Sequence, residues 1–149
     1  MTSFYGSQTY SIDAQGRLTI PAPMRRSAGT KKPINEFMLV LGFEGCLALY
    51  TLQQWKPIEE RLHQLPLGGR KARAFKRNFL MNATRVPVDS QGRITIPSVL
   101  GNQAGLGKEA VLLGQVNCIE IWEPQKLRAV MDEVSSHFED YAEDVFGGS

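Results

Sequence analysis

Hydrophobic and polar positions alternate on both sides of a short turn near the start of the chain. Tyr10 and Ile12 precede this turn, and Leu18 and Ile20 follow it. A period of two is typical of half-buried strands, so the pattern predicts two strands joined by the turn. Residues 86–97 carry the same pattern a second time.

Two further pairs of short apolar runs follow these turns. Residues 37–43 and 46–50 form the first pair, and residues 110–114 and 118–122 form the second. Runs of this length favour buried strands, so each turn is expected to be followed by a strand pair.

A helical period replaces the strand period at the end of the chain. Apolar residues three or four positions apart predict one amphipathic closing helix; they are Leu127, Val130, Met131, Val134, Phe138, Tyr141 and Val145. The matching segment of the first half contains Pro57. Because a proline deep inside a helix breaks it, we expect that helix to begin near Lys56.

The recurrence of the pattern extends to the residues themselves. Residues 10–21 read YSIDAQGRLTIP and residues 86–97 read VPVDSQGRITIP. Identical residues at an offset of 76 include Asp13, Gly16, Arg17, Thr19, Ile20 and Pro21 with Asp89, Gly92, Arg93, Thr95, Ile96 and Pro97. Beyond a longer connection at residues 30–38 the offset falls to 72, so that Cys46 matches Cys118. A correspondence this long indicates an internal duplication.

Each repeat has the residues of a tight turn followed by a short helix. Gly16 supplies the backbone freedom of a reversal, and the aspartate before it is a common turn initiator. Pro21 ends the strand and suits the first position of a helix, and Gly29 falls where a helix end favours glycine. All of these residues recur 76 positions later.

The repeats divide the chain into three parts. Residues 1–66 form the first repeat, residues 67–84 a connection, and residues 85–149 the second repeat with its acidic amphipathic helix. Apolar residues at helical spacing predict a basic amphipathic helix in the connection, where the basic residues are Arg70, Lys71, Arg73, Lys76 and Arg77. Most of these are expected to face solvent or another subunit. The repeats should then pack as halves of one pseudo-symmetric body.

Charge is distributed unevenly along the chain. Residues 1–130 hold all 17 Lys and Arg against 9 Asp and Glu, whereas residues 131–149 hold 6 acidic residues and no Lys or Arg. A basic body attracts polyanions, although a solubilising acidic helix on a mildly basic domain explains the same numbers. With neither a long apolar stretch nor a secretory signal at its start, the chain is expected to be cytoplasmic and not in a membrane.

The residue types needed for catalysis or metal binding are sparse. His63 and His137 do not recur between the repeats, and Cys46 and Cys118 have no neighbouring ligands. Nucleophilic catalysis and zinc binding need such groups close together. We therefore expect a protein that is not an enzyme, with no cofactor, no metal and two buried free thiols.

An arginine beside a turn glycine is what recurs instead. Arg17 and Arg93 could project toward nucleic acid, because arginine pairs with phosphate or with guanine O6 and N7. Equally, Asp13 could pair with Arg17, and Asp89 with Arg93, to lock each turn. Both interpretations can hold at once, with the aspartate aiming the arginine.

These residues resemble a known family. An Asp-x-x-Gly-Arg turn followed by apolar-x-apolar-Pro and a short helix resembles the swapped-hairpin β-barrel of SpoVT/AbrB-type transcription factors. Two such units in tandem, after Phe4-Tyr5-Gly6, are similar to the MraZ family of regulators. The resemblance implies an α+β, β-rich fold in which two tandem AbrB-like units pack as one pseudo-twofold barrel with peripheral helices.

The resemblance also implies a function and partners. It implies a sequence-specific transcriptional regulator, cytoplasmic and nucleoid-associated, that binds double-stranded DNA at short G-rich direct repeats upstream of the division and cell-wall gene cluster, including its own promoter. It implies a ring-shaped homo-oligomer, for which eight copies are favoured. The DNA-binding positions carried over are Asp13, Arg17, Asp89 and Arg93.

Two neighbouring residues are added to the expected DNA interface. Arg25 and Arg26 follow the first turn, whereas the second repeat has Gly101 and Asn102 there, which puts more weight on the first repeat. The competing hypotheses are an antitoxin-like protein whose acidic tail binds a partner, and a structural scaffold in which the arginines only lock their turns.

Overall fold

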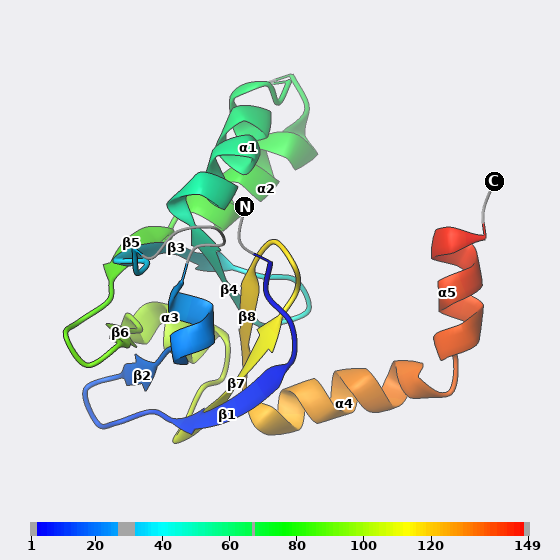
Figure 1. Cartoon of the computed structure of the whole chain (residues 1–149). Helices are drawn as coiled ribbons and strands as arrows, with labels where there is room; N and C mark the ends of the chain where they lie inside the picture. The colour runs from blue at the N-terminus through cyan, green and yellow to red at the C-terminus, as the bar shows by residue number, and fades with distance from the viewer. Residues whose placement is uncertain (1–2, 27–31, 67, 148–149) are drawn as a thin grey trace.

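The computed structural model describes residues 3–26, 32–66 and 68–147, and it shows a mixed α/β protein (Figure 1). The strands are β1 (Ser7–Ser11), β2 (Arg17–Thr19), β3 (Glu36–Leu41), β4 (Leu47–Thr51), β5 (Thr84–Pro87), β6 (Arg93–Thr95), β7 (Glu109–Gly114) and β8 (Ile119–Trp122). The helices are a 3-10 turn η1 (Ala22–Arg25) and α1 (Leu52–His63), α2 (Arg70–Leu80), α3 (Ser98–Gln103), α4 (Pro124–Ser135) and α5 (Phe138–Phe146). The strand pairs expected from the apolar runs are confirmed.

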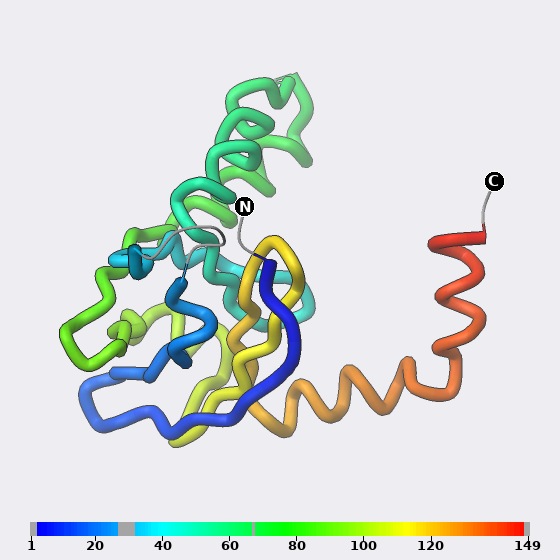
Figure 2. The backbone as a smooth tube through the Cα atoms, in the orientation of Figure 1, coloured from blue at the N-terminus to red at the C-terminus, as the bar shows by residue number. Residues whose placement is uncertain are grey.

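The two repeats share their sheets. Six strands pair in the order β1-β7-β8-β4-β3-β5, all antiparallel, and β2 pairs with β6 in a separate two-stranded ribbon. The first strand of each repeat therefore lies beside a strand of the other repeat. Figure 2 shows this for β1, which runs along the yellow β7–β8 segment.

Two strand pairs between the repeats, β4–β8 and β2–β6, are symmetric with respect to the two repeats. In the β4–β8 pair, Leu47 lies opposite Ile121 and Leu49 lies opposite Ile119. Since these residues are equivalent at the offset of 72, exchanging the repeats leaves the register unchanged. The β2–β6 ribbon has the same property at the offset of 76, with Leu18 opposite Ile94.

The six-stranded sheet packs on different partners on its two faces. Leu39, Leu47 and Leu49 face the core that also holds Leu18 and Ile94 of the ribbon. On the other face, a second cluster is formed by Val40, Ala48 and Cys118 with Trp55 and Leu62 of α1. The ribbon and the α1–α2 helices thus lie on opposite sides of the sheet.

The helix of the first repeat begins earlier than expected. It starts at Leu52 and contains Pro57, so the start near Lys56 is wrong. Thr51 caps this helix by accepting a hydrogen bond from the Gln54 amide at 3.0 Å, and Trp55 is buried. A capped and buried first turn holds the helix in place although the proline removes one backbone hydrogen bond.

The second closing helix is broken in two. It ends at Ser135, and α5 begins at Phe138 after a backbone change at His137 (φ −116, ψ 14). The expectation of one continuous helix is therefore wrong. Figure 1 shows α4 leading away from the sheets and α5 standing clear of the body, and no residue of either helix is buried.

A lysine at the start of α4 bonds this helix to the body. The Lys126 ammonium group donates to the Gly45 and Ala104 carbonyls, each at 3.1 Å. It thereby ties the β3–β4 turn to the end of α3. In the described part of the chain, none of the helices has the length and apolar character needed to span a membrane. The expected helix end at Gly29 lies outside the described residues.

Candidate nucleic-acid interface

The Asp-x-x-Gly-Arg turn of the first repeat is closed by its own aspartate. Asp13 Oδ1 accepts hydrogen bonds from the Gln15 amide at 3.0 Å and the Arg17 amide at 2.8 Å. Asp13 Oδ2 accepts from Arg17 Nε at 2.6 Å. Gly16 completes the reversal with a φ of +79, a value that glycine adopts without strain.

The second repeat builds the same turn. Asp89 Oδ1 accepts from the Gln91 and Arg93 amides, both at 2.9 Å, and Asp89 Oδ2 accepts from Arg93 Nε at 2.9 Å. Gly92 also has a φ of +79. The pairing of each aspartate with its own arginine, one of the two interpretations from sequence, is therefore present in both turns.

Each turn is also bonded to the other repeat. The Ile20 amide donates to the Gly92 carbonyl, and the Ile96 amide donates to the Gly16 carbonyl, both at 2.9 Å. These bonds continue the β2–β6 ribbon at its two ends. The position of each arginine consequently depends on both repeats.

The ribbon presents both arginines on one side. Leu18 and Ile94 are buried in the core, and side chains alternate between the faces of a strand. Arg17 and Arg93, on either side of these residues, therefore point outward with a threonine opposite each of them. The outward face carries two cations, one toward each end of a short two-stranded ribbon.

Hydrogen bonding keeps both turn carboxylates charged. The pKa of Asp13 lies below its ordinary value of 3.8, mainly because the Arg17 amide bonds to the carboxylate, with a further contribution from the Arg17 side chain. The pKa of Asp89 is lowered in the same way by Arg93. At neutral pH each turn thus holds an ionised aspartate against an arginine.

Arg25 lies beside the second turn and not the first. Its Nε donates to the Ile20 carbonyl at 2.7 Å, and its guanidinium covers Gly92, where an added Cβ would come within 2.7 Å of Arg25 Cζ. The exchange of strands between repeats causes this placement. The charge of Arg25 therefore stands at the turn that holds Arg93, although Arg25 follows the first turn in sequence. The greater weight of the first repeat in DNA binding stays a prediction.

The corresponding place at the first turn is open. A hollow of about 510 Å³ is lined by Asp13, Gly16 and Gly101, and Gly101 is the equivalent of Arg25. Arg26 is exposed and forms a β-bridge with Pro33. The two turns thus share their internal geometry and differ in the residues around them.

One polar neighbour lies outside the expected site. The Gln15 side chain accepts a hydrogen bond from Arg17 Nη2 at 3.3 Å. Its identity with Gln91 at the offset of 76 is the sequence signal that could have identified it. The basic residues of α2, by contrast, lie across the sheet from the ribbon and do not join this site.

These features define a class of duplicated β-rich proteins, in which two copies of one unit exchange strands and each contributes an arginine turn to a common ribbon. The chain matches the family model described as "MraZ protein, putative antitoxin-like" over residues 3–78 and again over residues 79–147. The chain belongs to the MraZ family. The resemblance drawn from the two turns, and the duplication, are confirmed.

Relatives similar over nearly the whole chain have the same family name. The protein named Transcriptional regulator MraZ in Ligilactobacillus salivarius is 40% identical over 142 residues, which is 95% of this chain and 96% of the relative. The proteins of that name in Natranaerobius thermophilus and Alkaliphilus metalliredigens are each 37% identical, over 95% and 93% of this chain and 96% and 94% of the relatives.

Proposed function

We propose that this protein is a DNA-binding transcriptional regulator that reads DNA with Arg17 and Arg93. The observation that carries the proposal is the β2–β6 ribbon, which holds both arginines on its outward face. The major groove of B-DNA admits a two-stranded β-ribbon. The names of the relatives, which are transcriptional regulators, support the same function.

The aspartates have a defined role in this mechanism. Each one engages the Nε side of its arginine, so the side chain is held before DNA arrives. The terminal nitrogens keep further N–H groups that can donate, although Arg17 Nη2 also contacts Gln15. A guanine offers O6 and N7 as two matching acceptors. Because less side-chain freedom is lost on binding, an arginine held in this way binds more tightly than a mobile one.

The remaining basic residues supply contacts to phosphate in this proposal. Arg25 adds a positive charge beside the second turn, and exposed Arg26 lies next to it in the chain. Contacts to phosphate position a protein on DNA without reading its sequence. We therefore assign base readout to Arg17 and Arg93 and backbone contact to Arg25 and Arg26, with Asp13 and Asp89 as positioning residues.

The finer statements that the family resemblance implies belong to the same proposal. The two repeats (1–66 and 85–149), joined by residues 67–84, form one swapped-hairpin β-barrel body. The protein binds short G-rich direct repeats upstream of the division and cell-wall gene cluster, regulates its own promoter, and acts in the cytoplasm at the nucleoid. It assembles as a ring, with eight copies favoured.

The test is a binding series with DNA from upstream of the protein's own gene. Affinity is measured at increasing salt for the parent, Arg17→Ala and Arg93→Ala, with exposed Arg128→Ala on α4 as the matched control. A bidentate base contact discriminates by ~1–3 kcal/mol, so each ribbon variant should lose roughly tenfold or more while the control is unchanged.

Two outcomes would contradict different parts of the proposal. If folded Arg17→Ala and Arg93→Ala bind like the parent, the assignment of the site is wrong. If the parent shows neither salt dependence nor a preference over unrelated DNA, it is not a DNA-binding regulator. That second outcome is the one expected of the alternative, an antitoxin-like or structural protein that binds another protein and uses the arginines only to lock its turns.

A further inference from the structure

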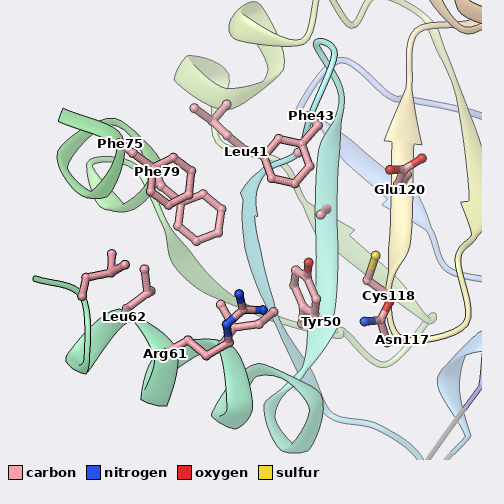
Figure 3. A pocket seen from close by; sticks show the side chains of 14 residues that line it. Leu41, Phe43, Tyr50, Arg61, Leu62, Phe75, Phe79, Asn117, Cys118 and Glu120 are labelled. Atoms are coloured by element: carbon pink, nitrogen blue, oxygen red, sulfur yellow. The ribbon is translucent and has the colours of Figure 1, made fainter. Parts of the chain in front are cut away.

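An open apolar pocket of about 360 Å³ lies between the α1–α2 helices and the sheet (Figure 3). Phe75 and Phe79 of α2 line it and are stacked with ring centroids 5.3 Å apart. Phe43, from the β3–β4 turn, also lines it and is 72% exposed. An apolar surface of this kind, left open to water, is typical of a binding site for an apolar partner.

The helix α5 has an exposed apolar face, which is complementary to this apolar pocket. Phe138, Tyr141 and Val145 lie three and four residues apart, on one face, and each is at least half exposed. This is the i, i+3, i+7 spacing by which amphipathic helices bind in grooves. The four acidic residues of α5 lie on the other side of the helix; they are Glu139, Asp140, Glu143 and Asp144.

The charges of the two surfaces are opposite. The segment from α1 to the end of α2, residues 52–80, has seven Lys or Arg and two Glu. The charged residues that line the pocket itself are Arg61 of α1 and Glu120 of β8, so the positive charge lies mainly on the helices around it. The segment 138–146 has four acidic residues and no Lys or Arg. Opposite charges around an apolar contact favour this pairing and oppose the pairing of α5 with another α5.

Within one chain the two surfaces are kept apart. Twelve residues of helix α4, ~18 Å at the usual rise of a helix, separate α5 from the sheet. Lys126 holds the start of α4 against the β3–β4 turn. Figure 1 shows α5 away from the α1–α2 helices, so the pocket of the same chain is not the one that α5 faces.

We infer that α5 of one copy docks into the α1–α2 pocket of a second copy. The Phe138, Tyr141 and Val145 face enters between Phe43 and Phe75, and the acidic side of α5 faces the basic residues of α1 and α2. The contact joins two different surfaces, so each copy in a chain of copies still has one free surface of each kind. Such head-to-tail contacts form a ring when the rotation between copies closes, which is the geometry that the proposed ring needs. The inference rests on the self-assembly in the proposed function and does not depend on DNA binding.

The first test measures the mass of the assembly in solution without DNA. Phe138→Glu/Val145→Glu places two charges on the docking face of a helix without buried residues, so the monomer should still fold. We expect assembly to weaken by roughly 100-fold or more, toward the monomer mass of 16.6 kDa. Met81→Glu, at an 81% exposed methionine outside both surfaces, is the control and should assemble like the parent.

The second test identifies the two surfaces by crosslinking between differently tagged copies. One copy carries Tyr141→Cys and the other Phe43→Cys, and a short bismaleimide is added. Burial raises the pKa of the native Cys46 thiol to about 12 and of Cys118 to about 11, so both remain protonated and react slowly. We expect a product joining the two tags, and none when Met81→Cys replaces Phe43→Cys.

Several results would overturn the inference. One is an unchanged mass for Phe138→Glu/Val145→Glu, which would place assembly on another surface. Another is crosslinking between two Tyr141→Cys copies in place of the mixed product, and a third is a crosslink within a monomer that carries both cysteines. A parent that is monomeric at micromolar concentration but binds its promoter would contradict the docking and leave the DNA-binding function standing.

Discussion

At the scale of single residues, Asp13 and Asp89 connect the shape of each turn to the position of its arginine. One carboxylate oxygen accepts two backbone amides, and the other accepts the arginine Nε. A single substitution at either aspartate therefore changes both the backbone and the side chain. The position of an arginine that was only a surface charge would not depend on the aspartate in this way.

Acid should weaken the fold through these two carboxylates. Their pKa values are lowered in the folded protein, so the folded state favours the ionised form. The stabilisation is complete above the unfolded pKa near 3.8 and is lost as the pH falls through the lower folded pKa. Urea midpoints measured from neutral to acid pH should fall less steeply for Asp13→Asn/Asp89→Asn than for the parent. Asp132→Asn, which removes an exposed carboxylate of α4 outside both turns and outside α5, is the matched control and should keep the parent's pH profile.

A side chain at Gly92 should disturb both the turn and Arg25. The φ of +79 is unfavourable for any other residue, and the new Cβ would meet the Arg25 guanidinium. We expect Gly92→Ala to cost ~1–2 kcal/mol of unfolding free energy in urea titrations. Gly107→Ala, with no atom within 4 Å of the added Cβ, is the control. Equal stability of the two variants would contradict the left-handed turn.

The turns themselves were predictable from sequence because the groups that form their internal hydrogen bonds lie within five consecutive residues. Asp13 to Arg17 contain the turn initiator, the glycine and both charges. The position of Arg25 was not predictable in this way. It depends on which strand of the other repeat lies alongside, and no local pattern contains that information.

At the scale of elements, the helices show where periodicity stops being informative. The apolar spacing from Leu127 to Val145 continues across the break at Ser136 and His137. A side-chain pattern records which face is apolar, and it does not record a bend that leaves the pattern in phase. For α1 the proline rule predicts too late a start, because the Thr51 cap and the buried Trp55 hold the first turn ahead of Pro57.

Replacing Pro57 should stabilise α1. The residue is exposed and lies in the sixth position of the helix, where its missing amide leaves a carbonyl without a helical partner. We expect Pro57→Ala to raise the unfolding free energy by about 1–2 kcal/mol, less than the ~3 kcal/mol interior cost because the unfolded chain becomes freer. Pro124→Ala, at the first position of α4, should change stability little. A thermal unfolding temperature lowered by Pro57→Ala would contradict this assignment.

At the scale of the whole molecule, the exchanged strands make each repeat depend on the other. Strand β1 pairs with β7, and β5 pairs with β3, so neither repeat has a complete sheet alone. The common core includes Leu18 from one repeat and Ile94 from the other. We therefore expect the two units that the sequence distinguishes to fold together.

Cutting the chain between the repeats should show this dependence. Residues 1–82 and 83–149, cut after the end of α2 and expressed separately, are each expected to lack cooperative unfolding and protection from hydrogen exchange, because their strand edges and apolar faces are unpaired. Mixing or coexpressing them should restore both properties. A cooperative transition in either fragment alone would mean that the repeats are independent domains.

The unequal surroundings of the two arginine turns give the ribbon a direction. A strictly twofold dimer offers DNA two equal halves and so reads inverted sequences. When both copies lie in one chain, their sequences can diverge. One such difference is Arg25, which covers Gly92 of the second turn, whereas its equivalent beside the first turn is Gly101. If the ribbon binds DNA as proposed, the DNA contacts two unequal ends, and such a polar binding surface matches the direct repeats proposed as its target.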